Sequence, residues 1–264
     1  MTTTEFGNGT VLSEVAEGVG RITLNRPEAR NALSTEVLAA LPEALRSLEQ
    51  DDEVNVLVLT GNDPAFCAGL DLRELGGSGG NINPDQPSTF LGPFPEHTKP
   101  LIGAINGVAV TGGLELALAC DFLIASDRAK FADTHARVGV MPGWGLSVLL
   151  PQAIGVRRAR EMSLTGNYLD AATAAEWGLV NRVVPHELLM PTVEAIAQDI
   201  CSNDQEGVRQ MINTYERTSS STVEDGWKIE ASMGRDWLQR TSFSPEKVAN
   251  RRAEIQNRGR AQSS

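Results

Sequence analysis

One long apolar run with a carboxylate inside it constrains the fold of this chain most strongly. The run covers residues 99–121, KPLIGAINGVAVTGGLELALACD, and its internal carboxylate, Glu115, follows the pair Gly112-Gly113 after one residue. About 20 apolar residues are enough to cross a bilayer, but Asn106, Glu115 and the repeated small residues disfavour a membrane span. We therefore predict that this run lies in a protein core.

The run divides into a predicted strand and a predicted helix. Residues 101–105 are short, apolar and preceded by a proline, which favours a buried strand, and residues 114–120 are rich in Leu and Ala, which favours a helix entered at Gly112-Gly113. The first turn of a helix has N–H groups without internal partners, and glycine allows a ligand close to them. The pattern predicts a site at Gly112 for an oxygen that becomes negative during a reaction.

Two interpretations of Glu115 are open at this point. It lies one helical turn after Gly112 and so on the same face, which suits a catalytic carboxylate. A structural acid in a buried ion pair would give the same pattern. A capping box is disfavoured, because with Thr111 as the N-cap the third helical residue is Leu114.

Two motifs together resemble the enoyl-CoA hydratase/isomerase (crotonase) superfamily over nearly the whole chain. They are NGVAVTGGLELALACD and, upstream, AFCAGLDL at residues 65–72. The resemblance implies that the backbone N–H groups of Leu70 and Gly112 form an oxyanion hole for an acyl-CoA thioester. It places Glu115 on one of the two catalytic glutamates of the family's hydratases. It also implies an α/β fold, a crotonase-like spiral of β-β-α units, followed by helices that cover the site and mediate trimer or hexamer formation.

The rest of the sequence predicts strands that alternate with helices, which indicates crossover units rather than a sandwich. We expect a hairpin over residues 10–24, a helix from Ser34 and a short helical piece over 71–75. Further strands are expected over residues 54–60, 121–126 and 181–184. The loop over residues 76–87 is expected to be a functional lid or partly disordered. Residues 1–200 are predicted to form the acyl-CoA-binding core. Residues 201–264 are predicted to form a C-terminal helical subdomain that serves as lid and oligomerisation element.

Composition excludes some functions and favours a compartment. The chain of 264 residues is 41% hydrophobic and 22% charged, an ordinary composition for a protein with a sizeable core. Its net charge of −11 opposes binding to nucleic acid or to an anionic membrane. Three widely spaced cysteines favour reduced thiols, and the N-terminus lacks a targeting pattern, so we expect a cytoplasmic protein.

Several motifs of other chemistries are absent from the sequence. No G-x-G-x-x-G follows a predicted strand, and neither a Walker A lysine nor a G-x-S-x-G nucleophile motif occurs. His97, His135 and His186 have no partners at metal-ligand spacing, so we predict no metal. We also expect no separate cofactor, because coenzyme A would be part of the substrate.

The sequence departs from the family's hydratases at the second catalytic acid. Those enzymes carry a second glutamate in the segment that here is FADTHARVGVMPGWG, residues 131–145, and His135 occupies its place. An imidazole can transfer protons near pH 7, with a pKa of roughly 6 to 7, so His135 is a candidate second group. Asp133 orients this ring, replaces it, or bonds its own backbone in a turn. A family dehalogenase has a nucleophilic aspartate where Gly143 stands, so that chemistry is not supported.

Five further residues are candidates for substrate binding. Arg26 and Arg30, in LNRPEARNAL, lie in the segment where the family meets the nucleotide and its phosphates. Ala68 and Asp71 flank the first oxyanion donor, although Asp71 also suits a cap of the following short helix. Trp144 is a candidate wall of the acyl pocket or a core residue.

These observations lead to one main hypothesis and two alternatives. The main hypothesis is an enoyl-CoA hydratase, which adds water reversibly to a trans-2-enoyl-CoA to give a 3-hydroxyacyl-CoA and assembles as a homotrimer or homohexamer. The alternatives are an enoyl-CoA isomerase and an acyl-CoA-binding paralogue without hydratase activity. The alternatives stay open because His135 stands where the family's hydratases carry their second glutamate.

Overall fold

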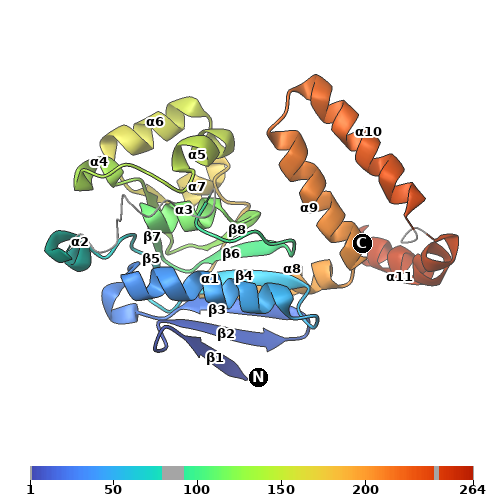
Figure 1. Cartoon of the computed structure of the whole chain (residues 1–264), viewed down its shortest axis with the longest axis horizontal. Coiled ribbons are helices and arrows are strands. Elements are labelled where there is room, and N and C mark those ends of the chain that lie inside the picture. Colours follow the sequence, from blue (N-terminus) through green and yellow to red (C-terminus); the bar gives the residue numbers. More distant parts are fainter. Residues whose placement is uncertain (1, 79–91, 241–243, 264) are drawn as a thin grey trace. The chain divides into compact units, whose positions relative to one another are not determined.

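The computed structural model describes residues 2–78, 92–240 and 244–263, and it divides the chain into two units, Met1–Asp204 and Gln205–Ser264. All the strands among these residues lie in the first unit (Figure 1). Most of the loop expected at residues 76–87 falls outside the described residues. None of the helices in the described ranges is both long and apolar enough to cross a lipid bilayer.

The first unit is built on a seven-stranded sheet with the order β1-β2-β3-β4-β6-β8-β11. The three N-terminal strands are antiparallel and the others are parallel, with these bounds: β1 Thr3–Phe6, β2 Val11–Ala16, β3 Val19–Leu24, β4 Val56–Gly61, β6 Leu101–Ile105, β8 Phe122–Ser126 and β11 Arg182–Val184. The predicted hairpin and the predicted strand over residues 101–105 are confirmed. β4 and β6 are buried at every residue, as expected for parallel strands that are covered on both faces.

A second sheet of four short strands, in the order β10-β9-β7-β5, accompanies the first. Its members are β5 Ala65–Cys67, β7 Val108–Val110, β9 Lys130–Ala132 and β10 Leu169–Asp170. β5, β7 and β9 follow β4, β6 and β8 in the chain, so each pair of strands spans both sheets before a helix begins. This repeat confirms the α/β spiral of β-β-α units.

Helices cover both faces of the large sheet (Figure 1). α1, Thr35–Gln50, packs on the face that includes Leu57 and Leu59, whereas α8, Leu189–Cys201, packs on the face that includes Val56 and Val58. Successive residues of a strand point to opposite faces, so these are the two sides of β4. The predicted N-cap of α1 is confirmed, since the Ser34 hydroxyl accepts a hydrogen bond from the Val37 N–H.

The remaining helices of the first unit connect and cover the strands. They are η1 Pro27–Ala29, α2 Leu72–Ser78, α3 Gly112–Leu118, α4 His135–Val138, α5 Leu146–Ile154, α6 Val156–Thr165, α7 Ala171–Trp177 and η2 His186–Leu188. The predicted entry of a helix at Gly112-Gly113 is confirmed by α3. Residues 106–111, where we expected only a turn, contain β7. A three-residue strand is too short to show a period of two in the sequence.

The second unit is helical and consists of α9 Gln205–Ser219, α10 Val223–Gln239 and α11 Pro245–Ser263. Among the residues whose burial the structure describes, Met233 is the only buried side chain in this unit. Met211, Tyr215 and Trp227 are exposed large apolar residues. The structure divides the chain after Asp204, close to the boundary at residue 201 expected from the sequence; the roles as lid and oligomerisation element stay predictions.

Candidate active site

Two backbone segments that are far apart in the sequence adjoin at the start of α3. A Cβ atom added to Gly112 would lie 3.9 Å from the Cα of Gly69, and one added to Gly69 would lie 3.5 Å from the Gly112 nitrogen. The parallel pairing of β5 with β7 brings these segments together. Leu70 and Gly112, the two predicted donors, therefore belong to neighbouring segments of backbone.

The peptide unit that carries the Leu70 N–H has a fixed orientation. The carbonyl of Gly69, in the same peptide, accepts a hydrogen bond from the Leu33 N–H at 2.8 Å, and the Leu33 carbonyl accepts one from the Asp71 N–H at 3.1 Å. In a trans peptide the C=O and the N–H point in opposite directions, so the Leu70 N–H points away from Leu33. It donates to no acceptor in the described part of the chain. Gly112 is the first residue of α3, and its N–H has no partner within the helix.

Thr111 holds a strained turn between β7 and α3. Its φ of 54° and ψ of −114° lie outside the regions that a β-branched residue normally adopts, which costs on the order of 1–3 kcal/mol. The Thr111 N–H donates to the Ala132 carbonyl at 3.0 Å, and its hydroxyl bonds the hydroxyl of Thr134. β9 and the start of α4 therefore maintain the turn. Thr111 is the N-cap residue of α3, but its side chain makes no capping bond.

Glu115 lies in the core and has two partners. The residue is 3% exposed, and its Oε1 accepts a hydrogen bond from the Trp144 backbone N–H at 2.8 Å. Its Oε2 lies 3.5 Å from Nε2 of His135. A buried carboxylate without partners would be costly, and these two contacts offset that cost. The contact from the Trp144 N–H was not predicted, because a backbone donor leaves no mark in the residue pattern.

Asp133 orients His135. Its Oδ1 lies 2.6 Å from Nδ1 of the ring and also accepts the His135 backbone N–H at 3.1 Å. The ring thus lies between two carboxylates, with Nδ1 toward Asp133 and Nε2 toward Glu115. His135 begins the short helix α4, where we expected a turn. In this geometry Asp133 contacts the ring of His135, as expected if it orients the ring; which of them replaces the second catalytic acid stays a prediction.

The two carboxylates stabilise the protonated imidazole. Burial opposes the charge on His135, but the hydrogen bonds and charges of Asp133 and Glu115 outweigh it and raise the pKa of His135 to about 9. Burial likewise opposes the charge on Asp133, but hydrogen bonds from His135 and Ser163 hold the pKa of that carboxyl below its usual value. This pKa is higher than the roughly 6 to 7 expected from the sequence, because Asp133 and Glu115 both stabilise the protonated ring. At neutral pH, His135 is an imidazolium.

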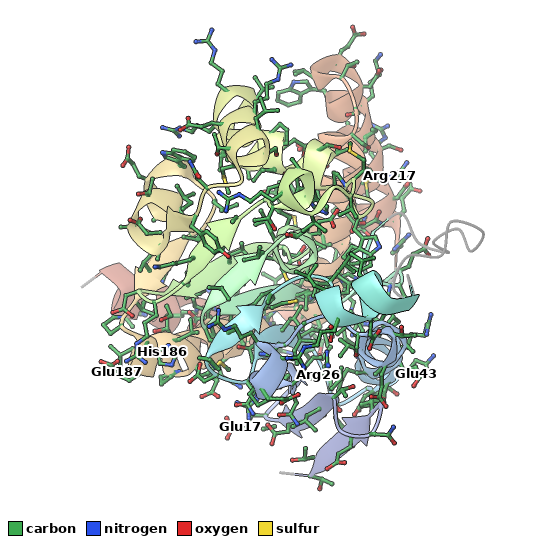
Figure 2. The ribbon with its side chains drawn as sticks, turned by 90° about the vertical axis from the view of Figure 1, so that its left-hand side faces the viewer. Glu17, Arg26, Glu43, His186, Glu187 and Arg217 are labelled. Carbon is green, nitrogen blue, oxygen red and sulfur yellow. The ribbon has the colours of Figure 1, made fainter. Side chains whose placement is uncertain are left out.

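Arg26, in the segment LNRPEARNAL, forms bonds with other residues of the protein. The Nη1 of Arg26, labelled in Figure 2, donates to the Ala32 carbonyl at 2.7 Å and lies 3.0 Å from Oδ2 of Asp71. Asp71 also accepts the Arg73 N–H at 3.0 Å, as a cap of α2 would. This pairing holds the pKa of Asp71 below its usual value, although burial opposes the shift. Both residues fix the segment that leads from Leu70 into α2, and contact with a substrate stays a prediction.

The other three candidate binding residues lie close to these elements. Arg30 is exposed and takes part in none of the ion pairs between described residues. The Ala68 N–H donates to the Arg30 carbonyl at 3.0 Å. The ring of Trp144 lies 3.6 Å from the point where a Cβ of Gly112 would be, so this half-buried side chain borders the adjoining backbone segments.

The part of the chain that the structure describes contains no arrangement of side chains that could bind a metal ion. No three His, Cys, Asp or Glu side chains are grouped there so that they could hold an ion. Cys67, Cys120 and Cys201 form no disulfide bond with one another. Burial raises the pKa of Cys67 to about 12, so this thiol beside the Leu70 segment is unreactive at neutral pH.

The spiral of β-β-α units across two sheets, followed by helices, is the fold of the crotonase structures. The model of the family described as enoyl-CoA hydratase/isomerase matches residues 14–253. The chain belongs to the enoyl-CoA hydratase/isomerase (crotonase) family.

Individual relatives cover most of the chain. A probable enoyl-CoA hydratase of Rhizobium meliloti is 37% identical over 94% of this chain and 98% of its own length. The crystal structure of an enoyl-CoA hydratase from Mycobacterium avium is 50% identical, covers 86% of this chain and 96% of that one, and superposes with a TM-score of 0.74. A monofunctional enoyl-CoA isomerase from M. smegmatis is 35% identical over 83% of this chain and 98% of that one, with a TM-score of 0.70.

Proposed function

We propose that this protein is an enoyl-CoA hydratase in which Glu115 and His135 form the acid–base pair. The observation that carries the proposal is the 3.5 Å contact between Oε2 of Glu115 and Nε2 of His135. Glu115 lies on α3, the helix that begins at Gly112. His135 is a cation at neutral pH, because its pKa is raised to about 9, and Glu115 places a carboxyl group beside it. Addition of water needs both a proton acceptor and a proton donor, which this pair supplies.

Glu115 activates the water and the backbone donors hold the thioester. As the water oxygen bonds to Cβ of the enoyl group, its proton passes to Glu115, and negative charge moves to the thioester oxygen. The N–H groups of Leu70 and Gly112 stabilise that oxygen, because they are fixed before the reaction and need no reorganisation. Removal of one such donor typically costs about 3 kcal/mol.

His135 completes the addition. Its Nε2–H gives a proton to Cα, and the electron pair of the enolate forms the new C–H bond as the thioester carbonyl returns. The pair is then a neutral imidazole beside a protonated Glu115. A proton transfer between the two atoms that lie 3.5 Å apart restores the starting state. Asp133 stabilises the imidazolium at the start and at the end of this cycle, since its Oδ1 lies 2.6 Å from Nδ1.

Binding of the substrate follows from the residues around the donors. Arg30 is the candidate for the phosphates of coenzyme A, because Arg26 already pairs with Asp71. Trp144 borders Gly112 and is the candidate wall for the acyl group. The family implies a homotrimer or homohexamer, and three cysteines without a disulfide bond support a reducing compartment such as the cytoplasm.

Isomerisation of an enoyl-CoA is the second candidate. The similarity to the monofunctional isomerase of M. smegmatis favours it, and a carboxylate–imidazole pair can also move a proton from one carbon to another. In that reaction no water is consumed, and the double bond shifts along the chain.

One assay separates these functions. The purified protein is incubated with short and medium trans-2-enoyl-CoAs, the absorbance of the conjugated thioester is followed, and the products are identified by mass. A hydratase gives a 3-hydroxyacyl-CoA that is heavier by one water. An isomerase gives a product of unchanged mass, and binding without turnover indicates the acyl-CoA-binding paralogue and contradicts the proposal.

A further inference from the structure

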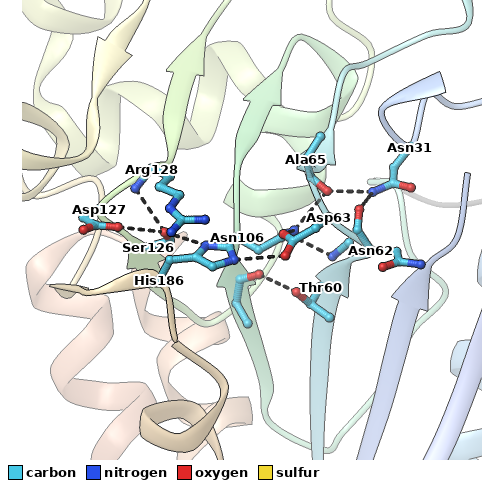
Figure 3. Close-up of polar contacts among 12 residues, drawn as sticks. Asn31, Thr60, Asn62, Asp63, Ala65, Asn106, Ser126, Asp127, Arg128 and His186 are labelled. Carbon is cyan, nitrogen blue, oxygen red and sulfur yellow. Dashed lines mark hydrogen bonds and ion pairs between the residues drawn. The ribbon is translucent and has the colours of Figure 1, made fainter. Parts of the chain in front are cut away.

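Two buried side-chain amides converge on one backbone carbonyl at the start of β5. The Ala65 carbonyl accepts a hydrogen bond from Nδ2 of Asn31 at 2.6 Å and another from Nδ2 of Asn106 at 3.2 Å (Figure 3). Asn31 is 1% exposed and Asn106 is 6% exposed. Ala65 is the first residue of the strand that leads to Ala68, Gly69 and Leu70.

Asn106 joins both backbone segments of the proposed oxyanion hole. It lies between β6 and β7, and β7 leads to Thr111 and Gly112. Besides the bond to Ala65, its Nδ2 donates to Oδ1 of Asp63 at 2.9 Å, and its Oδ1 accepts the Gly61 N–H at 3.2 Å. The Asn106 side chain, from the segment that leads to Gly112, thus bonds three residues of the segment that ends at Leu70. These residues are Gly61, Asp63 and Ala65.

Asn31 holds the same segment from the other side. Its Oδ1 accepts the Arg26 N–H at 2.8 Å, and its Nδ2 also donates to the Asn62 carbonyl at 2.8 Å. Its φ of 55° is in the left-handed region, which asparagine tolerates better than most residues. Asn31 lies two residues before Leu33, whose N–H fixes the Gly69–Leu70 peptide. The bonds of Asn31 therefore anchor the loop that sets the direction of the Leu70 N–H.

A series of polar contacts extends this network to η2 without forming a second reaction site. Oδ2 of Asp63 lies 3.0 Å from Nε2 of His186, and Nδ1 of His186 lies 3.0 Å from the Ser126 hydroxyl (Figure 3). Ser126 is buried and its hydroxyl also accepts the Arg128 N–H at 3.0 Å. These contacts support the position of Asp63 and, through it, of Asn106.

We propose that Asn31 and Asn106 are positioning residues that align the Leu70 N–H with the Gly112 N–H around the thioester oxygen. This inference rests on the proposed function, because it assumes that the two N–H groups bind that oxygen. A purely structural role would satisfy buried carbonyls and affect only stability. A positioning role also changes how strongly the bound thioester is polarised, and a displacement of about 1 Å can reduce a rate on the order of 100-fold.

The test uses a chromophoric thioester, 4-dimethylaminocinnamoyl-CoA, bound to the full chain. Hydrogen bonds to its carbonyl draw electron density along the conjugated system and shift its absorbance to longer wavelength. The wild type should produce this red shift. Asn31→Ala and Asn106→Ala should bind the probe but lose much of the shift, and their kcat for an enoyl-CoA should fall about 10- to 100-fold with KM changed by less than about threefold.

Thr60→Val is the matched control. The buried Thr60 hydroxyl donates to the Ala104 carbonyl at 2.9 Å, so this variant also removes a buried side-chain bond near the network but none to Ala65 (Figure 3). It should keep both the red shift and kcat. Asn31→Ser and Asn106→Ser replace any alanine variant that does not fold.

The outcomes separate the inference from the proposed function. Folded asparagine variants with an unchanged red shift and kcat would overturn the inference alone, as would failure of all four variants to fold, since the amides would then be structural. A wild type that neither shifts the probe nor turns over enoyl-CoAs would overturn the proposed function and the inference with it.

Discussion

Glu115 and His135 face each other in the core of the first unit, with Oε2 and Nε2 3.5 Å apart and side chains that are 4% and 6% exposed. A single charge at this depth would cost several kcal/mol, and each residue reduces the cost of the other. Asp133 adds a second carboxylate on the far nitrogen of the ring. The pKa of His135 is therefore higher than that of an ordinary histidine.

The pH dependence of hydration should show a loss of rate as the pH rises through about 9. The pKa of His135 is raised to about 9, so the acid form that donates to Cα predominates below this pH and is lost above it. The measurement is kcat against pH from 6 to 10, with His135→Gln as the comparison. The wild type alone should show this alkaline limb; a single titration near pH 6 to 7 would mean that the carboxylates do not hold the proton.

Replacement of Asp133 by asparagine should lower the pKa of His135, because the charge beside Nδ1 is removed while the shape is kept. We expect the alkaline limb of kcat to move to lower pH and kcat at neutral pH to fall roughly 10- to 100-fold, with little change in KM. Asp170→Asn is the control, since the Asp170 carboxylate accepts the Thr173 N–H at the start of α7. An unchanged profile in Asp133→Asn would make that carboxylate a packing residue.

The approach of α3 to β5 predicts an effect on stability. A Cβ atom at Gly113 would lie 2.2 Å from the carbonyl oxygen of Cys67, a distance that only a shift of one backbone segment can relieve. Gly113→Ala should therefore lower the free energy of unfolding by roughly 2–4 kcal/mol, measured by urea denaturation. Gly76→Ala, in the exposed helix α2 with no atom within 4 Å, should be neutral or slightly stabilising. Equal effects of the two substitutions would contradict this packing.

Self-association is predicted by the apolar side chains of the second unit. Met211, Tyr215 and Trp227 are exposed on α9 and α10, and Ile212, Ile229 and Trp237 are half-buried. Exposed apolar surface of this kind marks an interface between proteins. Light scattering on the full chain at micromolar concentration should give the mass of an oligomer. The mass of a monomer would count against the prediction.

Long, strongly patterned elements of this fold were predictable from the sequence. The hairpin of β2 and β3 has alternating polarity, the buried strand β6 is a short apolar run after a proline, and the helix α1 has a capping serine. The second sheet was not predictable, because β5, β7 and β9 have three residues each and gain their stability from pairing across the chain. Local propensity carries no information about such partners.

The sequence indicated the side chains of the candidate site but not their electrostatics, and their catalytic roles stay predictions. Glu115 stood out as a carboxylate in an apolar run, and the family resemblance indicated Leu70, Gly112 and His135. The pKa of His135 could not be predicted, since it depends on a 2.6 Å contact with Asp133 and a 3.5 Å contact with Glu115. The Trp144 N–H and the strained φ of Thr111 are backbone features, and the residue types give no sign of them.

The most direct test of the account is the rate of enoyl-CoA hydration by Glu115→Gln. The amide keeps the shape of the side chain but cannot take a proton from water, so kcat should fall by roughly two to four orders of magnitude. The affinity for an acyl-CoA, measured by calorimetry on the same preparation, should stay nearly unchanged. A Glu115→Gln variant that retains full kcat would contradict the assignment of Glu115 as the catalytic base.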